Sequence, residues 1–156
     1  MNPLIHLLLS FQGRINRALF WRGLLMLLLL ELGVASLVNP ALFDFSTDVV
    51  ADEQPVETFW HVAMLYPWTA LGVKRFNDRD WPFWVGYAVG AITLVVAMAP
   101  LAGLANGDPA AWNALEWTLI GAVAVVGIAA LIDNGFLRGS QGPNRHGPDP
   151  LAAATA

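Results

Sequence analysis

Two carboxylates have the spacing of a divalent-metal site. Asp78 and Asp80 form a D-x-D sequence, and carboxylate oxygens are ligands that Mg²⁺ and Ca²⁺ prefer in proteins. Pairs of this kind hold a divalent ion in glycosyl-transfer enzymes. However, Arg75 and Arg79 are interleaved with the two aspartates. We therefore expect ion-paired carboxylates in a loop rather than a metal site.

The other residue types that carry catalysis are scattered. The three histidines, His6, His61 and His146, fall in separate segments and indicate no metal cluster. The chain has no cysteine, which excludes a disulfide framework, a thiolate metal site and a cysteine nucleophile. It also lacks a G-x-S-x-G elbow and a Walker-type phosphate loop. We predict no catalytic residue, no metal and no cofactor, and a lipid-modifying enzyme stays open as an alternative.

One carboxylate lies inside an apolar run. Glu31 is about nine residues beyond Arg22, or roughly 13 Å at 1.5 Å per residue, which would place it well inside the hydrocarbon layer. Ionisable residues at such a depth often mark functional sites. We predict that its partners on the next run are Tyr66 and, nearer the surface, His61. Two interpretations stay open: Glu31 locks two helices together, or it lines a transport pathway.

The composition indicates that membrane-spanning helices position these residues. Of the 156 residues, 56% are hydrophobic and 13% are charged, compared with about 25% charged in a typical soluble domain. Four apolar runs, at about 18–38, 58–73, 83–104 and 117–137, are long enough to cross about 30 Å of hydrocarbon, the second only barely. We predict an all-α membrane protein, with residues 1–156 forming one four-helix domain. Its formal net charge of −4 argues against a nucleic-acid partner.

The first residues are apolar and the arginines follow them. A secretion signal has the opposite order, so we expect no cleaved signal here. We predict instead a short interfacial helix from Leu4 to Phe11, broken by Gly13 before the first span begins. A frayed apolar terminus is the alternative.

All eight basic residues fall in three segments, which alternate with acidic connections. They are Arg14, Arg17, Arg22, Lys74, Arg75, Arg79, Arg138 and Arg145. With four spans, the positive-inside rule places both termini and the loop at 73–82 in the cytoplasm, and residues 138–156 form a cytoplasmic tail. The acidic connection 39–57 would lie outside. Trp21, Trp81 and Trp84 are predicted to anchor the inner membrane boundary.

Three segments resemble the signature segments of one family. They are FQGRINRALFW (11–21), VKRFNDRDWPFW (73–84) and GPNRHGPDP (142–150), in the same order and at similar spacing. Over nearly its whole length, the chain resembles the DUF805 family of small bacterial inner-membrane proteins. The resemblance implies a four-helix protein with a basic cytoplasmic loop and no established biochemical activity. Asn77 stands where the family usually has a histidine, so a role that needs that histidine is not implied.

We predict that the three inner segments form a folded cytoplasmic cap. Its members are Arg14, Arg17, Lys74, Arg75, Asn77, Asp78, Arg79, Arg138, Asn144 and Arg145. The Gly and Pro residues of the tail fix its backbone shape. Within the cap, we expect Arg75 and Asp78, three residues apart, to form an exposed ion pair.

Small residues favour close helix packing. Gly86 and Gly90 form G-x-x-x-G in the third run, Gly121 and Gly127 lie in the fourth, and we favour packing within the bundle over oligomerisation. The leading function is a non-catalytic module whose cap binds a partner membrane protein or anionic lipid. The main alternative is an oligomeric transport or channel subunit that uses Glu31.

Overall fold

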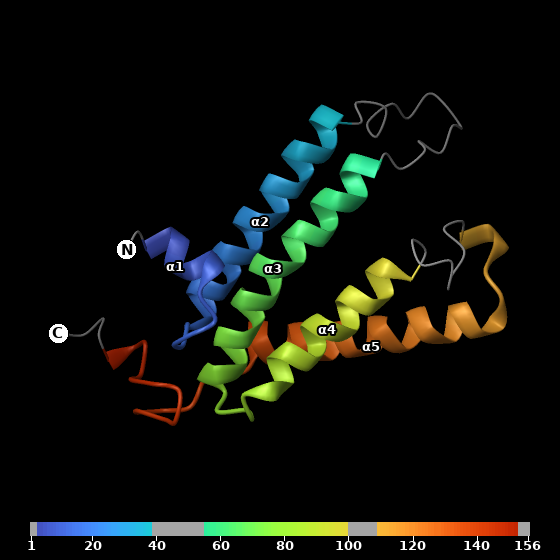
Figure 1. Ribbon diagram of the computed structural model, residues 1–156. Coiled ribbons are helices and arrows are strands. Elements are labelled where there is room, and N and C mark those ends of the chain that lie inside the picture. The colour runs from blue at the N-terminus through green and yellow to red at the C-terminus, as the bar shows by residue number, and fades with distance from the viewer. Residues whose placement is uncertain (1–2, 39–54, 100–108, 153–156) are drawn as a thin grey trace.

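Helices make up the described part of the chain. The computed structural model describes residues 3–38, 55–99 and 109–152, which contain no strand (Figure 1). In chain order the elements are α1 (Pro3–Leu9), α2 (Arg17–Val38), α3 (Pro55–Asp78), α4 (Trp84–Met98), the short 3-10 helix η2 (Pro109–Ala111) and α5 (Ala114–Phe136). The all-α prediction is confirmed for these residues. Most of the predicted acidic connection (39–54) and the end of the third predicted span (100–104) lie outside them.

The helices α2 and α3 lie side by side and carry the apolar core (Figure 1). Leu27 of α2 and Leu71 of α3 are fully buried, together with Phe20, and Ile15 joins them from the segment before α2. Gly23 lets the two helices approach, because a methyl group added there would lie 2.7 Å from Leu71 Cδ1. The core occupies the half of the pair nearer the start of α2.

The G-x-x-x-G of α4 packs against α3. A methyl group added at Gly86 would lie 2.8 Å from Val73 Cα, and one at Gly90 would lie 2.5 Å from Thr69 Cγ2. Only glycine allows these two helices to approach so closely. The predicted packing within the molecule is therefore confirmed for this motif. The helix α4 begins at Trp84 with Phe83 as its N-cap, at the start of the third predicted run.

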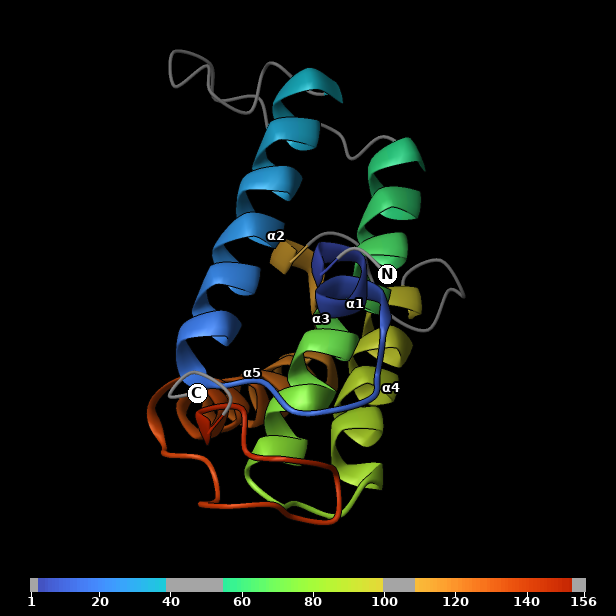
Figure 2. The ribbon, with the colours of Figure 1, turned by 90° about the vertical axis from the view of Figure 1, so that its left-hand side faces the viewer.

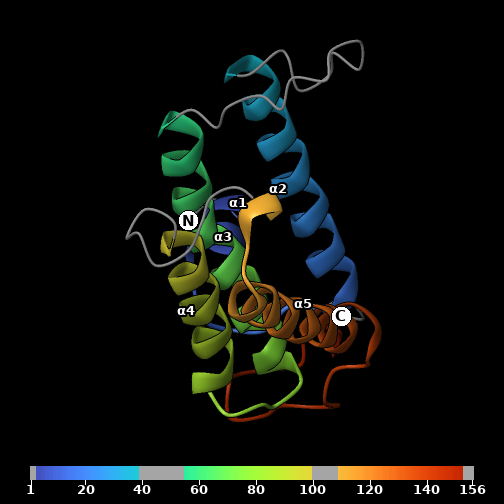
Figure 3. The same ribbon diagram turned by 90° about the vertical axis from the view of Figure 1, so that its right-hand side faces the viewer.

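The helix α5 runs crosswise to the others. Figure 3 shows α5 end-on, whereas α2, α3 and α4 are seen along their length. It packs through its last turn, where Asn134 and Gly135 are buried, and most of the helix is exposed. A methyl group at Gly121 or Gly127 would meet no described atom within 4 Å. Gly121 and Gly127 therefore do not pack within the described molecule, contrary to our expectation.

Two helices in the described ranges could cross a membrane. By length and composition these are α2 and α5, and α4 is a shorter apolar helix. The second predicted span corresponds to α3, whose last turn adds charged residues to the apolar run. These observations are compatible with a membrane protein, and the number of crossings stays a prediction.

The first described residues form the short helix α1, where the sequence predicted a helix from Leu4 to Phe11. In Figure 2, α1 lies across the front of the α2–α3 pair, and it contacts α3. Its Leu7 is buried in the core. The positive φ of Gly13, 86°, turns the chain after α1, at the residue predicted to break it. The placement of α1 at a membrane surface stays a prediction.

The charged segment 73–84 is mostly helix rather than loop. α3 ends in a Schellman motif, in which Trp81 N donates to Phe76 O and Asp80 N donates to Asn77 O, both at 3.1 Å. Asp80 adopts the left-handed conformation that this motif requires, with φ of 59°. The Trp81 and Phe76 rings make the accompanying apolar contact, with centroids 6.3 Å apart. Lys74, Arg75 and Asp78 consequently lie within α3.

Candidate functional site

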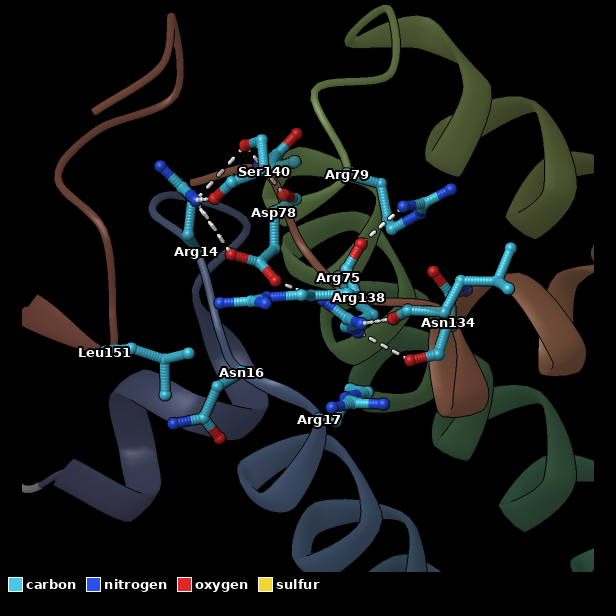
Figure 4. A network of polar contacts seen from close by, with 12 residues as sticks. Arg14, Asn16, Arg17, Arg75, Asp78, Arg79, Asn134, Arg138, Ser140 and Leu151 are labelled. Atoms are coloured by element: carbon cyan, nitrogen blue, oxygen red, sulfur yellow. Dashed lines mark hydrogen bonds and ion pairs between the residues drawn. The ribbon is translucent and has the colours of Figure 1, made fainter. Parts of the chain in front are cut away.

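The three signature segments meet at one end of the molecule. We call this region the polar cap; it consists of residues 13–17, 74–81 and 133–149. Figure 4 shows Arg14, from the first segment, between Asp78 of α3 and Ser140 of the tail. The predicted convergence of basic residues from three segments is thus found in the structure. The partners that hold the cap together were mostly not predicted.

Arg14 is the centre of the polar cap. Its Nε and Nη2 donate to Asp78 Oδ1 at 3.1 and 3.0 Å, and Nη2 also donates to the Ser140 carbonyl at 2.7 Å. Its Nη1 donates to the carbonyls of Gly142 and Gly147 at 2.8 and 3.2 Å. The five N–H groups of a guanidinium are therefore all used. With 1% of its side chain exposed, Arg14 binds the tail to α3 and is not available to a ligand.

Asp78 accepts from a second arginine as well. Arg75 Nη1 donates to Asp78 Oδ2, so the predicted pair exists, but its two side chains are only 0% and 5% exposed. The expectation of an exposed pair was wrong, because α5 and the tail cover the end of α3. Burial raises the pKa of the Asp78 carboxyl, and Arg75 and Arg14 oppose that rise. A buried ion pair of this kind holds only while every partner is in place.

Arg75 and Arg17, together with Trp21, bind the carbonyl groups at the C-terminus of α5. Four consecutive carbonyls at this end accept side-chain hydrogen bonds: those of Asn134 and Leu137 from Arg75, that of Gly135 from Trp21, and that of Phe136 from Arg17. A helix leaves its last carbonyls unpaired, and cations stabilise that end of its dipole. Arg79 adds a contact with the Arg138 carbonyl and a 3.4 Å pair with Asp133.

Asparagines fix the tail on the end of α3. Asn144 Nδ2 donates to the Asn77 carbonyl and to Ser140 Oγ, both at 2.9 Å. Asn77 Nδ2 in turn donates to the Gly13 carbonyl at 3.1 Å. Asn77 therefore has a structural role as an amide, joining the segment before α2 to the tail.

The D-x-D aspartates are both ion-paired, as expected. Asp78 is held as described above, and Asp80 Oδ1 accepts from Arg145 Nε at 2.9 Å. Arg145 also donates to the Asp80 carbonyl, and His146 Nε2 donates to the Trp81 carbonyl at 3.0 Å. The described residues contain no group of three histidine, cysteine, aspartate or glutamate side chains that could hold a metal ion.

The Lys74 side chain donates hydrogen bonds to α1 and not to the other cap residues. It is 1% exposed, and its Nζ donates to the carbonyls of His6, at 2.8 Å, and Leu7. Burial lowers the pKa of Lys74 to about 8. Tyr66 Oη adds a donation to the Leu9 carbonyl at 3.0 Å. Lys74 and Tyr66 therefore hold the end of α1 on α3.

Glu31 has a partner that the sequence did not indicate. Its Oε1 accepts a hydrogen bond from Trp68 Nε1 at 3.0 Å, between α2 and α3. The prediction of Tyr66 as its partner was wrong, because the Tyr66 hydroxyl reaches α1 instead. His61 is exposed on the surface of α3. The contact with Trp68 supports the helix-locking interpretation of Glu31.

The predicted anchor tryptophans differ in their surroundings. Trp81 and Trp84 are 42% and 58% exposed, as residues at a membrane boundary would be. Trp21 is bonded to α5, and its ring lies edge-on to Phe136 with centroids 5.5 Å apart. Trp21 thus joins two helices.

Several cap residues were missed by sequence reasoning. Asp133, Asn134 and Ser140 lie at or just after the end of α5, and they make contacts with α3 that span 54 to 62 residues of chain. Asp133 and Asn134 are polar residues at the end of an apolar run, which is the one signal that could have indicated them.

The described residues define a small helical protein with two candidate membrane helices. At one end, the buried polar side chains of the cap bind one another and the backbone. The family model described as "Protein of unknown function (DUF805)" matches residues 8–148. The chain is also 32% identical over 143 residues to "Uncharacterized protein YiiR" of Escherichia coli K12, which covers 91% of this chain and 86% of that protein. The protein of the same name in Escherichia coli O157:H7 matches to the same extent. This chain therefore belongs to the DUF805 family. No solved structure matches it.

Proposed function

We propose that this protein is a non-catalytic module of the bacterial inner membrane whose polar cap binds anionic lipid headgroups. It crosses the membrane four times, at about 18–38, 58–73, 83–104 and 117–137, with both termini in the cytoplasm. The apolar composition, the candidate helices α2 and α5 and the segregation of all eight basic residues support this threading.

One observation carries the proposal: the three basic segments fold together around the buried Arg14–Asp78 pair. A loop that serves only to set topology needs positive charge but no defined shape. Here the buried donors are used within the protein, and the tail is fixed to α3 through Asn144 and Ser140. The cap is therefore a shaped surface, which is what selective binding requires.

The charges available to a ligand are those that remain exposed. Within the polar cap, Arg17, Arg138 and Arg145 are exposed, whereas Lys74 and Arg75 are buried. Arg17 begins α2, at the predicted inner boundary of the membrane. Each basic residue near an anionic membrane surface contributes about 1 kcal/mol. This position favours lipid headgroups over a soluble partner.

Lipid and protein co-purification tests the proposal. The protein would be extracted from native membranes in polymer-bounded nanodiscs, and its bound lipids and proteins would be identified by native mass spectrometry. We expect anionic phospholipid to be enriched over the bulk membrane. A stoichiometric partner protein without that enrichment would replace the lipid proposal with a protein-binding one. Bulk lipid composition and no partner would overturn the binding role.

A further inference from the structure

A cavity opens in the polar cap beside the start of α2. It has a volume of about 330 Å³, and its walls include Asn16, Arg17, Arg138, Gln141, Asp149 and Leu151. This volume lies at the lower end of the range for small-ligand sites, about 300–1,000 Å³. In Figure 4 the Arg138 side chain extends into the space between Asp78, Asn16 and Leu151. We call this space the cap cavity.

Arg138 is fixed through its backbone, and its guanidinium keeps unused hydrogen-bond donors, although its charge interacts at longer range with that of Asp149. Its carbonyl accepts from Arg79 Nη1, which fixes the chain at this point. No hydrogen bond or ion pair joins its guanidinium to another residue of the described ranges. This contrasts with Arg14, whose five donors are all used. Arg138 thus presents unpaired donors to the cap cavity.

Arg17 faces the same space in a fixed orientation. Its Nη1 donates to the Phe136 carbonyl at 2.9 Å, which leaves Nε and Nη2 without a partner among the residues described. Arg17 and Ala18 are also the first two residues of α2, where a helix leaves its N–H groups unpaired and its dipole is positive. These groups add to the attraction for an anion.

The carboxylates in the wall do not compete for these donors. Asp149 accepts from Gly142 N through Oδ2 and from Leu151 N through Oδ1, both at 2.9 Å. Both oxygens of Asp78 accept from Arg14 and Arg75. The acidic oxygens therefore already accept hydrogen bonds within the cap, and the donors left for a ligand include those of the Arg17 and Arg138 guanidinium groups.

We propose that the cap cavity binds a phosphate group between Arg17 and Arg138. Guanidinium groups match phosphate oxygens in geometry and charge. The inference rests on the proposed function in one respect: the phosphate is that of an anionic phospholipid, and free phosphate is the other source of the same chemistry. Leu151 provides an apolar contact at the cavity wall, which suits a headgroup attached to a glycerol backbone.

The test compares arginines that line the cavity with one that does not. Purified full-length protein in neutral detergent would be titrated with short-chain phosphatidylglycerol, short-chain phosphatidylcholine and inorganic phosphate. We expect Arg138→Gln to weaken phosphatidylglycerol binding roughly tenfold or more, the scale of one charge-assisted contact. Its thermal stability should change little, because the Arg138 guanidinium makes no hydrogen bond or ion pair with the described residues and interacts with Asp149 only at longer range. Arg22→Gln removes the same charge outside the cavity and should change binding less than about twofold.

The outcomes separate the cavity from the proposed function. If Arg22→Gln weakens phosphatidylglycerol binding as much as Arg138→Gln does, the attraction is a diffuse effect of surface charge. The cap cavity is then not the binding site, and the proposal that the polar cap binds lipid still stands. If inorganic phosphate binds as tightly as phosphatidylglycerol and Arg138→Gln weakens both, the phosphate site stands and the lipid source is wrong. If the wild-type protein binds neither, both proposals are overturned.

Discussion

Arg14 and Asp78 are 64 residues apart in the chain, and they meet through two hydrogen bonds of 3.0 and 3.1 Å with both side chains almost fully buried. Arg14 also holds three carbonyls of the tail. A buried charge is costly unless its partners are present. This pair therefore fixes the tail, the start of α2 and the end of α3 relative to one another.

Arg14→Gln should destabilise the protein by about 3–5 kcal/mol, since it leaves the buried Asp78 with only one of its two arginine partners and releases the tail carbonyls. The matched control is Arg145→Gln, which removes the exposed ion pair with Asp80 and should cost about 0–1 kcal/mol. Unfolding in detergent measures both changes, and limited proteolysis of the tail reports its release. Equal stability of the two variants would contradict a central role for Arg14.

Gly139→Ala should loosen the tail even though it adds only one methyl group. That group would collide with Asp78 Oδ2, so either the carboxylate or the tail must move, at a cost of about 1–3 kcal/mol. Gly127→Ala is the control, because a methyl group there meets no described atom within 4 Å. It should be neutral or slightly stabilising in a helix. Melting temperatures that fall equally in the two variants would disprove the close approach.

The helices and the meeting of three segments were predictable because both follow from patterns along the chain. Apolar runs predicted α2 and α5. The alternation of basic and acidic connections predicted which helix ends lie on the same side of the membrane and so can meet. The burial of Arg75 was not predictable, since it depends on the last turn of α5 lying across the end of α3. Trp68 as the partner of Glu31 depends likewise on the relative rotation of two helices, which hydropathy does not specify.

Glu31→Gln should leave the fold intact, because an amide oxygen can still accept the hydrogen bond from Trp68. Glu31→Leu should weaken the α2–α3 contact by roughly 1 kcal/mol, the scale of one such bond in a membrane. Trp68→Phe removes the donor from the other side and should match Glu31→Leu. Unfolding in detergent compares the three variants. If Glu31→Gln proves as unstable as Glu31→Leu, the carboxylate has a role beyond this hydrogen bond.

Stability should rise with pH above about 8 because of Lys74. Its pKa is lowered from 10.5 to about 8 in the folded protein. Between these two pH values the unfolded chain binds more protons than the folded protein, so the free energy of unfolding rises with pH. A neutral amine can still donate to the carbonyls of His6 and Leu7. The gain is about 3 kcal/mol at most. Lys74→Met should lack it, and denaturant titrations of both proteins from pH 7.5 to 10.5 test this; parallel curves would show that the wild-type gain has another source.

Thiol labelling measures most directly whether the polar cap faces the cytoplasm. The chain has no cysteine, so a single one reports without background. Gln141→Cys places it at an exposed site of the cap, and Asp48→Cys places it in the acidic connection predicted to lie outside. With a membrane-impermeant maleimide, we predict that Gln141→Cys reacts in inverted vesicles but not in intact spheroplasts, and that Asp48→Cys shows the reverse. Labelling of Gln141→Cys in intact spheroplasts would contradict a cytoplasmic cap.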